Sequence, residues 1–299
     1  MKSSDVLLAV AALIIVVSLI CIGFYPSVQE FMAANSLWNG IRNFSQEFDA
    51  TNLDSLDKLP ELPQGKTLVA IPYLQYEDED LLNIRKFVTE GGSLLLMDDY
   101  GYGNSVLQYL GLNVRFSGES LLDPLYCYKN QWLPKITDFS PELKESGVEV
   151  VLLNHATILT DVGESDVIAW SSSSSFLDLD EDESWGQEEP RGPFPVAAKF
   201  KLGKGTVALV SDPSIMINSM MRKDDNYSFI KYLTAPNLEP EQVLIDRSHL
   251  PKGRRDESKI GLTNLRKILS MPYPLLGLTA AVFIIVSRYT LKKGEKIGQ

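Results

Sequence analysis

Two long uncharged apolar runs near the ends of the chain constrain its architecture more than any other feature. Residues 6–29 and 268–287 contain no Asp, Glu, Lys or Arg. At a helical rise of about 1.5 Å per residue, either run is long enough to cross a hydrocarbon core of about 30 Å. The sequence therefore predicts two transmembrane helices with a large domain between them.

The flanks of the two runs predict how such a chain would sit in a membrane. The first run follows Lys2, but "GFYPSVQEF" offers no clear small-x-small cleavage site, so residues 1–24 are expected to be a signal anchor. The basic tail, residues 288–299, favours cytoplasmic termini, whereas the basic residues within 252–267 favour the opposite orientation. Large domains translocate largely regardless of such charges. We therefore expect a two-pass protein of the cell membrane, in contact with the lipid bilayer and with an extracytoplasmic domain.

The charge and the cysteine content exclude several classes of function. The net charge is −11 at pH 7, which repels a phosphate backbone, so nucleic acid is not an expected partner. Cys127 is the only cysteine between the two apolar runs. The domain therefore has no internal disulfide, and neither CxxC nor Cys/His zinc patterns are available to it.

The chain between the runs changes character near residue 67. Residues 25–66 become rich in Asp and Pro and are expected to be a stalk or linker. Apolar strands and helices then alternate, which indicates an α/β sheet covered on both faces. The expected strands are 67–73, 93–99, 148–154, 166–172, 195–203 and 206–212, with the last two joined as a hairpin at "GKG". The expected helices are 77–92, 104–112 and 228–233. This divides the remainder into an α/β domain (67–240), a basic juxtamembrane segment (241–267), the second span (268–287) and the tail (288–299).

Polar residues gather where the predicted strands end, which is where α/β sheets bind ligands. They form a candidate rim for a ligand or partner: Asp98, Asp99, Asn104, His155, Trp185, Asp212, Asn218, Asp225 and Asn226. A structural role is the alternative, because Asp212, Asn218 and Asn226 are types that cap helices and close turns.

Patterns for cofactor binding and nucleophilic catalysis are incomplete. "GYGNSV" (101–106) has Val106 where a dinucleotide fingerprint needs its third glycine, and the preceding acidic pair would repel a pyrophosphate. We expect no cofactor, with Asn104 capping a helix instead. No G-x-S-x-G or G-x-C-x-G elbow follows an apolar strand. The imidazole bases are His155 and His249, and His249 lies in the basic segment, so nucleophilic catalysis would require a tertiary pairing of Cys127 with His155.

Two classes of function remain open on these residues. The first is a non-enzymatic interaction or sensing module. The second is a hydrolase that uses His155 with Asp98 or Asp212 as its carboxylate partner.

A strongly acidic run lies between Ser171 and Pro195. Four of its carboxylates match positions 1, 3, 5 and 12 of a calcium-binding loop: Asp178, Asp180, Asp182 and Glu189. Glu183 stands where that loop needs its turn glycine, so the run is only a weak calcium candidate. We expect a solvated recognition loop that Trp185 anchors by packing beside the strand after Pro195.

Two stretches carry a family resemblance: "FVTEGGSLLLMDDYGYGNSVLQYLGL" and "ESWGQEEPRGPFPVAAKFKLGKGTVALVSDPSIMINSMMRKDDN". With these the chain resembles DUF4350, a prokaryotic membrane-anchored family with a glutamine-amidotransferase-like domain, and more distantly gliding-motility-type ABC transporter auxiliary proteins. The resemblance implies a flavodoxin-like, class I amidotransferase-like sandwich without the nucleophilic cysteine. It also implies a non-enzymatic role among membrane proteins of a complex, often with a MoxR-type ATPase. The matching pattern positions are Gly91, Gly92, Asp98, Asn104, Ser184, Trp185, Gly192, Pro193, Asp212, Asn218 and Asn226.

Overall fold

The computed structural model describes residues 27–234 and 242–251, together with residues 10, 11, 13–15, 17–19, 253, 258, 261 and 262. The chain divides into two compact units. One comprises Met1–Tyr25 and Lys252–Gln299, and the other is Pro26–Pro251. All the helices and strands named below belong to the second unit, which carries the candidate site.

The prediction of two flanking transmembrane helices is wrong. In the part of the chain that the structure describes, no helix combines the length and the apolar character needed to cross a membrane. The longest helix named there, α3 (Asp78–Thr89), has 12 residues, which at about 1.5 Å per residue reaches about 18 Å rather than about 30 Å. Most of 6–29 and all of 268–287 lie outside the described residues. The prediction rested on hydropathy alone, which does not establish helix length, and the two-pass placement in a cell membrane falls with it.

The domain is a mixed α/β structure built on one eight-stranded sheet. Its strand order is β1 (Thr51–Leu53), β14 (Gln242–Asp246), β2 (Lys66–Ala70), β3 (Ser93–Met97), β13 (Gly205–Val210), β12 (Pro195–Leu202), β10 (Val167–Trp170) and β7 (Asp138–Phe139). Neighbours from β1 to β13 are parallel, and those from β13 to β7 are antiparallel. The antiparallel pair of β12 and β13 confirms the predicted hairpin at "GKG".

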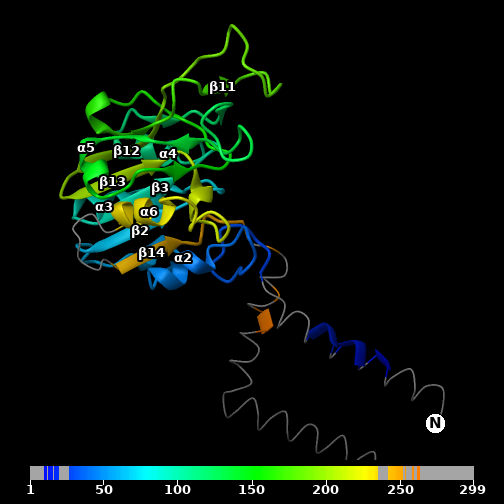
Figure 1. Cartoon of the computed structure of the whole chain (residues 1–299). Helices are drawn as coiled ribbons and strands as arrows, with labels where there is room; N and C mark the ends of the chain where they lie inside the picture. Colours follow the sequence, from blue (N-terminus) through cyan, green and yellow to red (C-terminus); the bar gives the residue numbers. More distant parts are fainter. Residues whose placement is uncertain are drawn as a thin grey trace, which may run out of the picture. The chain divides into compact units, whose positions relative to one another are not determined.

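The central strands are buried on both faces because helices cover both sides of the sheet. Along β3, Leu95 and Met97 face one core, and Leu94 and Leu96 face the other, as strand alternation requires. Helices α2 (Arg42–Glu47) and α6 (Asn226–Thr234) pack on the first face, and α3 and α4 (Asn104–Leu110) on the second (Figure 1). This arrangement explains why the strands read as continuous apolar runs rather than alternating ones.

The domain also contains small two-stranded sheets and short helices. Three two-stranded sheets pair β4 (Arg115–Phe116) with β9 (Leu159–Thr160), β5 (Ser120–Leu122) with β11 (Phe176–Asp178), and β6 (Lys135–Ile136) with β8 (Val151–Leu152). The short helices are α5 (Pro141–Glu145), η1 (Leu56–Lys58), η2 (Glu164–Asp166) and η3 (Pro213–Met216). The predicted strand 148–154 is thus reduced to β8, outside the main sheet.

Two segments predicted to lie outside the α/β domain belong to it. Within the expected linker 25–66, Phe31 and Phe44 are buried in the core and β1 forms an edge of the main sheet. Within the expected juxtamembrane segment 241–267, β14 pairs on one side with β1 and on the other with β2. Both strands are short and flanked by charged residues, so local composition concealed them.

Candidate functional site

The central strands β2, β3 and β13 end side by side, and the residues after them form the carboxyl edge of the sheet. All three run parallel, so their ends point the same way. Asp98 and Asp99 follow β3, Ser211 and Asp212 follow β13, and Tyr73 lies just beyond β2. The charge of Asp98 helps to raise the pKa of Asp99, and the charge of Asp99 helps to raise the pKa of Asp212. The structure therefore brings three predicted site residues together at this edge.

Asp98 is a buried turn-forming carboxylate. Its Oδ1 atom accepts hydrogen bonds from the amides of Tyr100 and Gly101 at 2.9 and 3.1 Å, and its Oδ2 atom accepts one from Gly103 at 2.5 Å. Burial raises the pKa of Asp98, and these amides oppose the rise. With both oxygens occupied, Asp98 shapes the turn before α4.

Asp212 is fully buried and holds two segments in place. Its Oδ2 atom accepts a hydrogen bond from the Asn154 amide at 2.6 Å, and its Oδ1 atom accepts one from the Ser214 amide at 2.7 Å, which caps η3. Burial raises the pKa of Asp212 well above its ordinary value, and the charge of Asp99 adds to the rise. Its carboxylate is therefore committed to backbone amides, as the structural alternative for this residue anticipated.

Asp99 differs from both of these carboxylates. It is half-buried, and its side chain accepts no hydrogen bond from another residue of the described ranges, only from its own amide. Burial raises the pKa of Asp99 to about 7, with further contributions from the charges of Asp98 and Glu30. Of the three carboxylates at this edge, Asp99 is the one with capacity to bind something else.

Three tyrosine rings lie near one another at this edge and are called here the tyrosine cluster: Tyr73, Tyr100 and Tyr102. The ring centroid of Tyr73 lies 6.1 Å from that of Tyr100 and 6.3 Å from that of Tyr102, and those of Tyr100 and Tyr102 lie 5.8 Å apart. Tyr100 and Tyr102 are 60% and 53% exposed. Burial and then the charge of Asp99 raise the pKa of Tyr73, and the charge of Asp99 is the main cause of the raised pKa of Tyr100. These rings are absent from the predicted rim, because that rim was drawn mainly from carboxylate, amide and imidazole side chains.

His155 is not hydrogen-bonded to Asp98 or Asp212. Its exposed ring stacks on Trp132 with centroids 4.6 Å apart, and within the described residues it makes no hydrogen bond or ion pair. The residue has a left-handed backbone with φ 59°. Partial burial lowers the pKa of His155. The structure therefore does not assemble a base and carboxylate pair from these predicted residues.

Four other predicted rim residues join distant parts of the backbone. Asn104 exchanges hydrogen bonds with Phe116: its Nδ2 atom donates to the Phe116 carbonyl at 3.0 Å, and its Oδ1 atom accepts from the Phe116 amide at 2.8 Å. Asn104 therefore links α4 to β4, and Gly103, not Asn104, is the N-cap of α4. Asn218 accepts from the Asn43 amide at 2.9 Å and donates to the Leu37 carbonyl at 2.6 Å.

The two residues at the start of α6 act in the same way. Asp225 accepts hydrogen bonds from the amides of Glu149 and Val150, both at 2.9 Å. Asn226 is fully buried, accepts from the Leu152 amide at 2.8 Å and donates to the Leu152 carbonyl at 2.9 Å. These contacts fasten α6 to β8 and leave neither side chain directed at a ligand.

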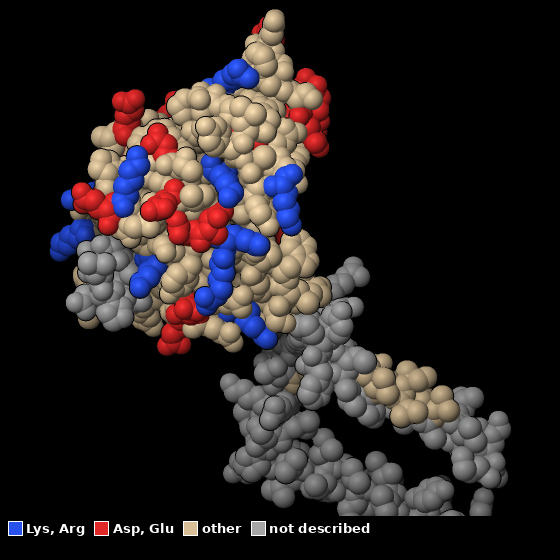
Figure 2. All heavy atoms as spheres, viewed as in Figure 1, with Lys and Arg blue, Asp and Glu red and all other residues tan. Residues whose placement is uncertain are grey.

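The acidic run is a compact loop after β11. Oxygen atoms of Asp178, Asp180 and Asp182 lie within 4.8 Å of one another. Glu189 is not part of this group: its oxygens accept from the amides of Gly186 at 2.8 Å and Leu179 at 2.7 Å, which lower its pKa. The fourth carboxylate of the calcium pattern therefore caps the loop. Figure 2 shows acidic side chains gathered by the part of the domain that carries β11.

Trp185 does not anchor this loop to the strand after Pro195 as predicted. Its ring is 42% exposed and lies under the Arg191 guanidinium, 4.0 Å from the centroid. Its Nε1 atom donates to the Glu189 carbonyl at 3.2 Å. These partners belong to the same acidic segment, so the tryptophan stiffens the loop internally.

A buried cluster around His249 was missed from the sequence. His249 Nδ1 lies 2.7 Å from Asp246 Oδ2, its Nε2 lies 3.3 Å from Asp80 Oδ2, and its ring stacks on Tyr76 with centroids 3.8 Å apart. Burial lowers the pKa of His249, but the two carboxylates outweigh burial and leave it raised. The available signal was Asp246 directly after the apolar triplet Val243–Leu244–Ile245, which marks a strand end.

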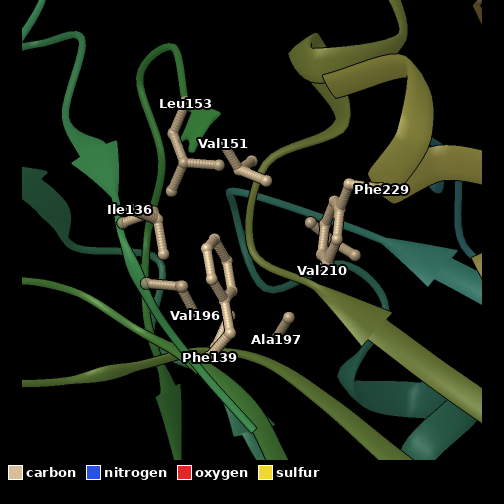
Figure 3. Close-up of a pocket in the computed structure, with 9 residues that line it drawn as sticks. Ile136, Phe139, Val151, Leu153, Val196, Ala197, Val210 and Phe229 are labelled. Atoms are coloured by element: carbon tan, nitrogen blue, oxygen red, sulfur yellow. The ribbon is translucent and has the colours of Figure 1, made fainter. Parts of the chain in front are cut away.

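Two hollows of the described domain are lined by residues other than the three carboxylates of this edge. One gap, shown in Figure 3, is too narrow for a water molecule and wholly apolar, and its lining includes Phe139, Val151, Val210 and Phe229. An open hollow between α3 and α4 is lined by Leu81, Arg85, Ser105, Gln108 and Tyr109. The first is a packing defect of the core, and none of the residues that line the second belongs to the candidate site described above.

Comparisons with known proteins place the chain in a family. The chain is similar to the solved mmIFT52 N-terminal domain, with 15% identity, 62% of this chain and 84% of that chain covered, and a TM-score of 0.47. It is also similar to a beta-galactosidase from Bacillus circulans sp. alkalophilus (11% identity, 58% and 24% covered, TM-score 0.32) and to the exo-beta-1,4-mannosidase Op5Man5 from Opitutaceae bacterium strain TAV5 (10%, 56% and 25%, 0.30). These weak likenesses carry no functional argument, and no curated protein matches the chain. A domain of unknown function, DUF4350, matches residues 33–234, and this chain belongs to that family.

Proposed function

We propose that this chain is a non-enzymatic interaction module that recognises a partner protein through the carboxyl edge of its sheet. The observation that carries the proposal is the tyrosine cluster, in which Tyr100 and Tyr102 are 60% and 53% exposed beside the half-buried Asp99. Exposed aromatic rings next to a polar group are typical of the residues that dominate protein interfaces.

The chemistry at this edge supports binding more than catalysis. Asp98 and Asp212 hold backbone amides, and His155 stacks on Trp132 without a hydrogen bond to either carboxylate in the described structure. A hydrolase would need a base within hydrogen-bond reach of its partner. The hydrolase alternative therefore gains no support from a specific contact.

The proposal also covers the type of domain that this chain forms and the complex in which it acts. We propose an amidotransferase-like domain that lacks the nucleophilic cysteine and acts as an auxiliary subunit of a complex with a MoxR-type ATPase or a transporter. Supporting this, Cys127 lies between β5 and β6, outside the ends of the parallel strands where an elbow nucleophile would sit.

Site-specific photo-crosslinking of the full chain tests the proposal. A photoreactive residue at position 102 is expected to capture a partner in cells. The same residue at Leu62, which is exposed and precedes β2 at the opposite edge, should not capture it. Equal capture from both positions, or none at position 102, would refute recognition through this edge.

A further inference from the structure

We propose that Asp99 and the tyrosine cluster bind an arginine side chain of a partner protein. This inference rests on the proposed function and names the chemistry that the partner must present. It follows from the geometry of three rings, from the charges around them and from the oxygens that remain free.

The rings of the tyrosine cluster offer faces to a cation. Their interplanar angles are 63° for Tyr73 with Tyr100, 40° for Tyr73 with Tyr102 and 42° for Tyr100 with Tyr102. Rings inclined in this way leave parts of their faces open, and ring faces attract cations. Within the described residues, Lys and Arg lie over Tyr109, Tyr128, Tyr227, Tyr232 and Trp185, but over none of the cluster rings.

Within the described residues, the charges that act on Asp99 are negative. The charged neighbours that act on Asp99 are Asp98 and Glu30, and Glu30 also acts on Tyr73 and Tyr100. No Lys, Arg or His of the described residues forms an ion pair with Asp99, Asp98, Asp212 or Glu30. A carboxylate that is half-buried among other acids is destabilised in its charged form, and an incoming cation would remove that destabilisation.

The free ligand atoms favour a guanidinium over a metal ion. Asp98 and Asp212 already use their oxygens to accept backbone amides. This leaves the carboxylate of Asp99, whereas Ca²⁺ needs about six to eight oxygen ligands. A planar guanidinium can stack on a tyrosine ring and direct two N–H groups at one carboxylate, which a lysine ammonium cannot do.

Protonation of Asp99 should control this binding. Because the pKa of Asp99 is raised to about 7, arginine binding is coupled to release of its proton. The groups that face it are the carboxylates of Asp98, Glu30 and Asp212 and the phenols of Tyr73 and Tyr100. Affinity should therefore rise by about tenfold between about pH 6 and about pH 8.

The test is a ligand-observed NMR titration of the full chain with a short Gly/Ser peptide that contains one central arginine. The control peptide carries citrulline, the neutral counterpart of arginine. Asp99→Asn and Tyr102→Leu should each weaken binding of the arginine peptide by about fivefold to tenfold. Tyr126→Leu, which removes an exposed tyrosine outside the cluster, should leave the affinity unchanged.

Several results would overturn the inference. They are equal binding of the citrulline peptide, equal binding of a lysine peptide, equal weakening by Tyr126→Leu, and an affinity independent of pH. Crosslinking separates this inference from the proposed function. A partner captured at position 102 through a contact segment without arginine would leave the proposed function standing and refute the arginine site, whereas loss of all capture at position 102 would refute the interaction edge itself.

Discussion

The Nδ1 atom of His249 lies 2.7 Å from Oδ2 of Asp246, and this pair secures the carboxyl end of β14. Both side chains are buried, and Tyr76 adds a hydrogen bond to the same Asp246 oxygen at 3.2 Å. The His249 carbonyl also accepts the amides of Tyr73 and Leu74, both at 3.1 Å. The backbone of Tyr73, a member of the tyrosine cluster, is therefore hydrogen-bonded directly to His249, just beyond the end of β14.

His249 should make the stability of the domain depend on pH. Burial lowers the pKa of His249 in the folded state, but Asp246 and Asp80 outweigh burial and leave it raised. Its contribution to the free energy of unfolding is therefore complete below about pH 6.5 and is lost as the pH rises through the folded-state pKa. His249→Gln should lower the free energy of unfolding by about 3 kcal/mol at about pH 5.5 and by less at about pH 9. Urea unfolding across this range measures the difference. His155→Gln should change the pH profile in the opposite sense, because burial lowers the pKa of His155 in the folded state. Parallel profiles for His249→Gln and wild type would contradict the assignment.

Asp99→Asn should stabilise the domain at high pH. Since the pKa of Asp99 is raised to about 7, the folded state holds its proton more tightly than the unfolded chain, and stability falls as the pH rises from about 4 to about 7. The asparagine side chain does not titrate and therefore removes that fall, so the free energy of unfolding should increase by roughly 1–2 kcal/mol at about pH 8. This gain is smaller than the full pKa shift implies, because the carboxylate is partly exposed. Thermal unfolding at about pH 5 and about pH 8 checks the sign. A variant that is less stable than wild type at the higher pH would show that the charge of Asp99 is already compensated.

Asn226→Ala should destabilise the domain without affecting recognition at the carboxyl edge. The substitution leaves the Leu152 amide and carbonyl without their side-chain partner and also removes a hydrogen bond to the Met220 carbonyl at 3.1 Å. Loss of these buried contacts is expected to cost about 3 kcal/mol in the free energy of unfolding. The matched control is Asn113→Ala, because Asn113 is exposed and its side chain makes no hydrogen bond within the described residues. Chemical denaturation of the two variants side by side should separate them clearly.

Trp185→Ala should change the global stability by less than about 1 kcal/mol, because the ring is partly exposed and its contact with Arg191 and its hydrogen bond to Glu189 lie within its own loop. It should instead increase proteolytic cleavage within the acidic loop under native conditions. A large fall in melting temperature would show that the loop supports the core. Calorimetric titration with Ca²⁺ is expected to show no tight binding, because Glu189 is occupied by two amides.

Much of the central framework could be predicted from the sequence because it is local. The strands around Leu95 and Leu209 are continuous apolar runs, and α3 begins with three acidic residues and is followed by Gly91 and Gly92. Such signals depend only on neighbouring residues. The positions of Asp98, Asp99 and Asp212 at one edge followed from this framework, because parallel strands end together.

The remainder depends on contacts between distant residues and left little local trace. β1 has three residues and becomes recognisable as a strand only through its pairing, whereas β14 was assigned to the basic segment despite its apolar triplet. Asn226 acts through its hydrogen bonds to Leu152, and His249 acts through its ion pair with Asp80. Residue type alone therefore suggested that Asn226 belongs to a binding rim and His249 to a basic segment. The tyrosine cluster was overlooked because the mutual contact of its three inclined rings exists only in three dimensions.

The place of β14 in the sheet sets an order of events during synthesis. Its residue Leu244 pairs with Thr51 on one side and Leu68 on the other, so β1 and β2 cannot be joined until residues 242–246 have left the ribosome. Until then each of them presents an unpaired strand edge, which is a template for association with another chain. A nascent chain of this protein is thus exposed to aggregation until β14 emerges, and a chain truncated before residue 242 preserves that vulnerable intermediate.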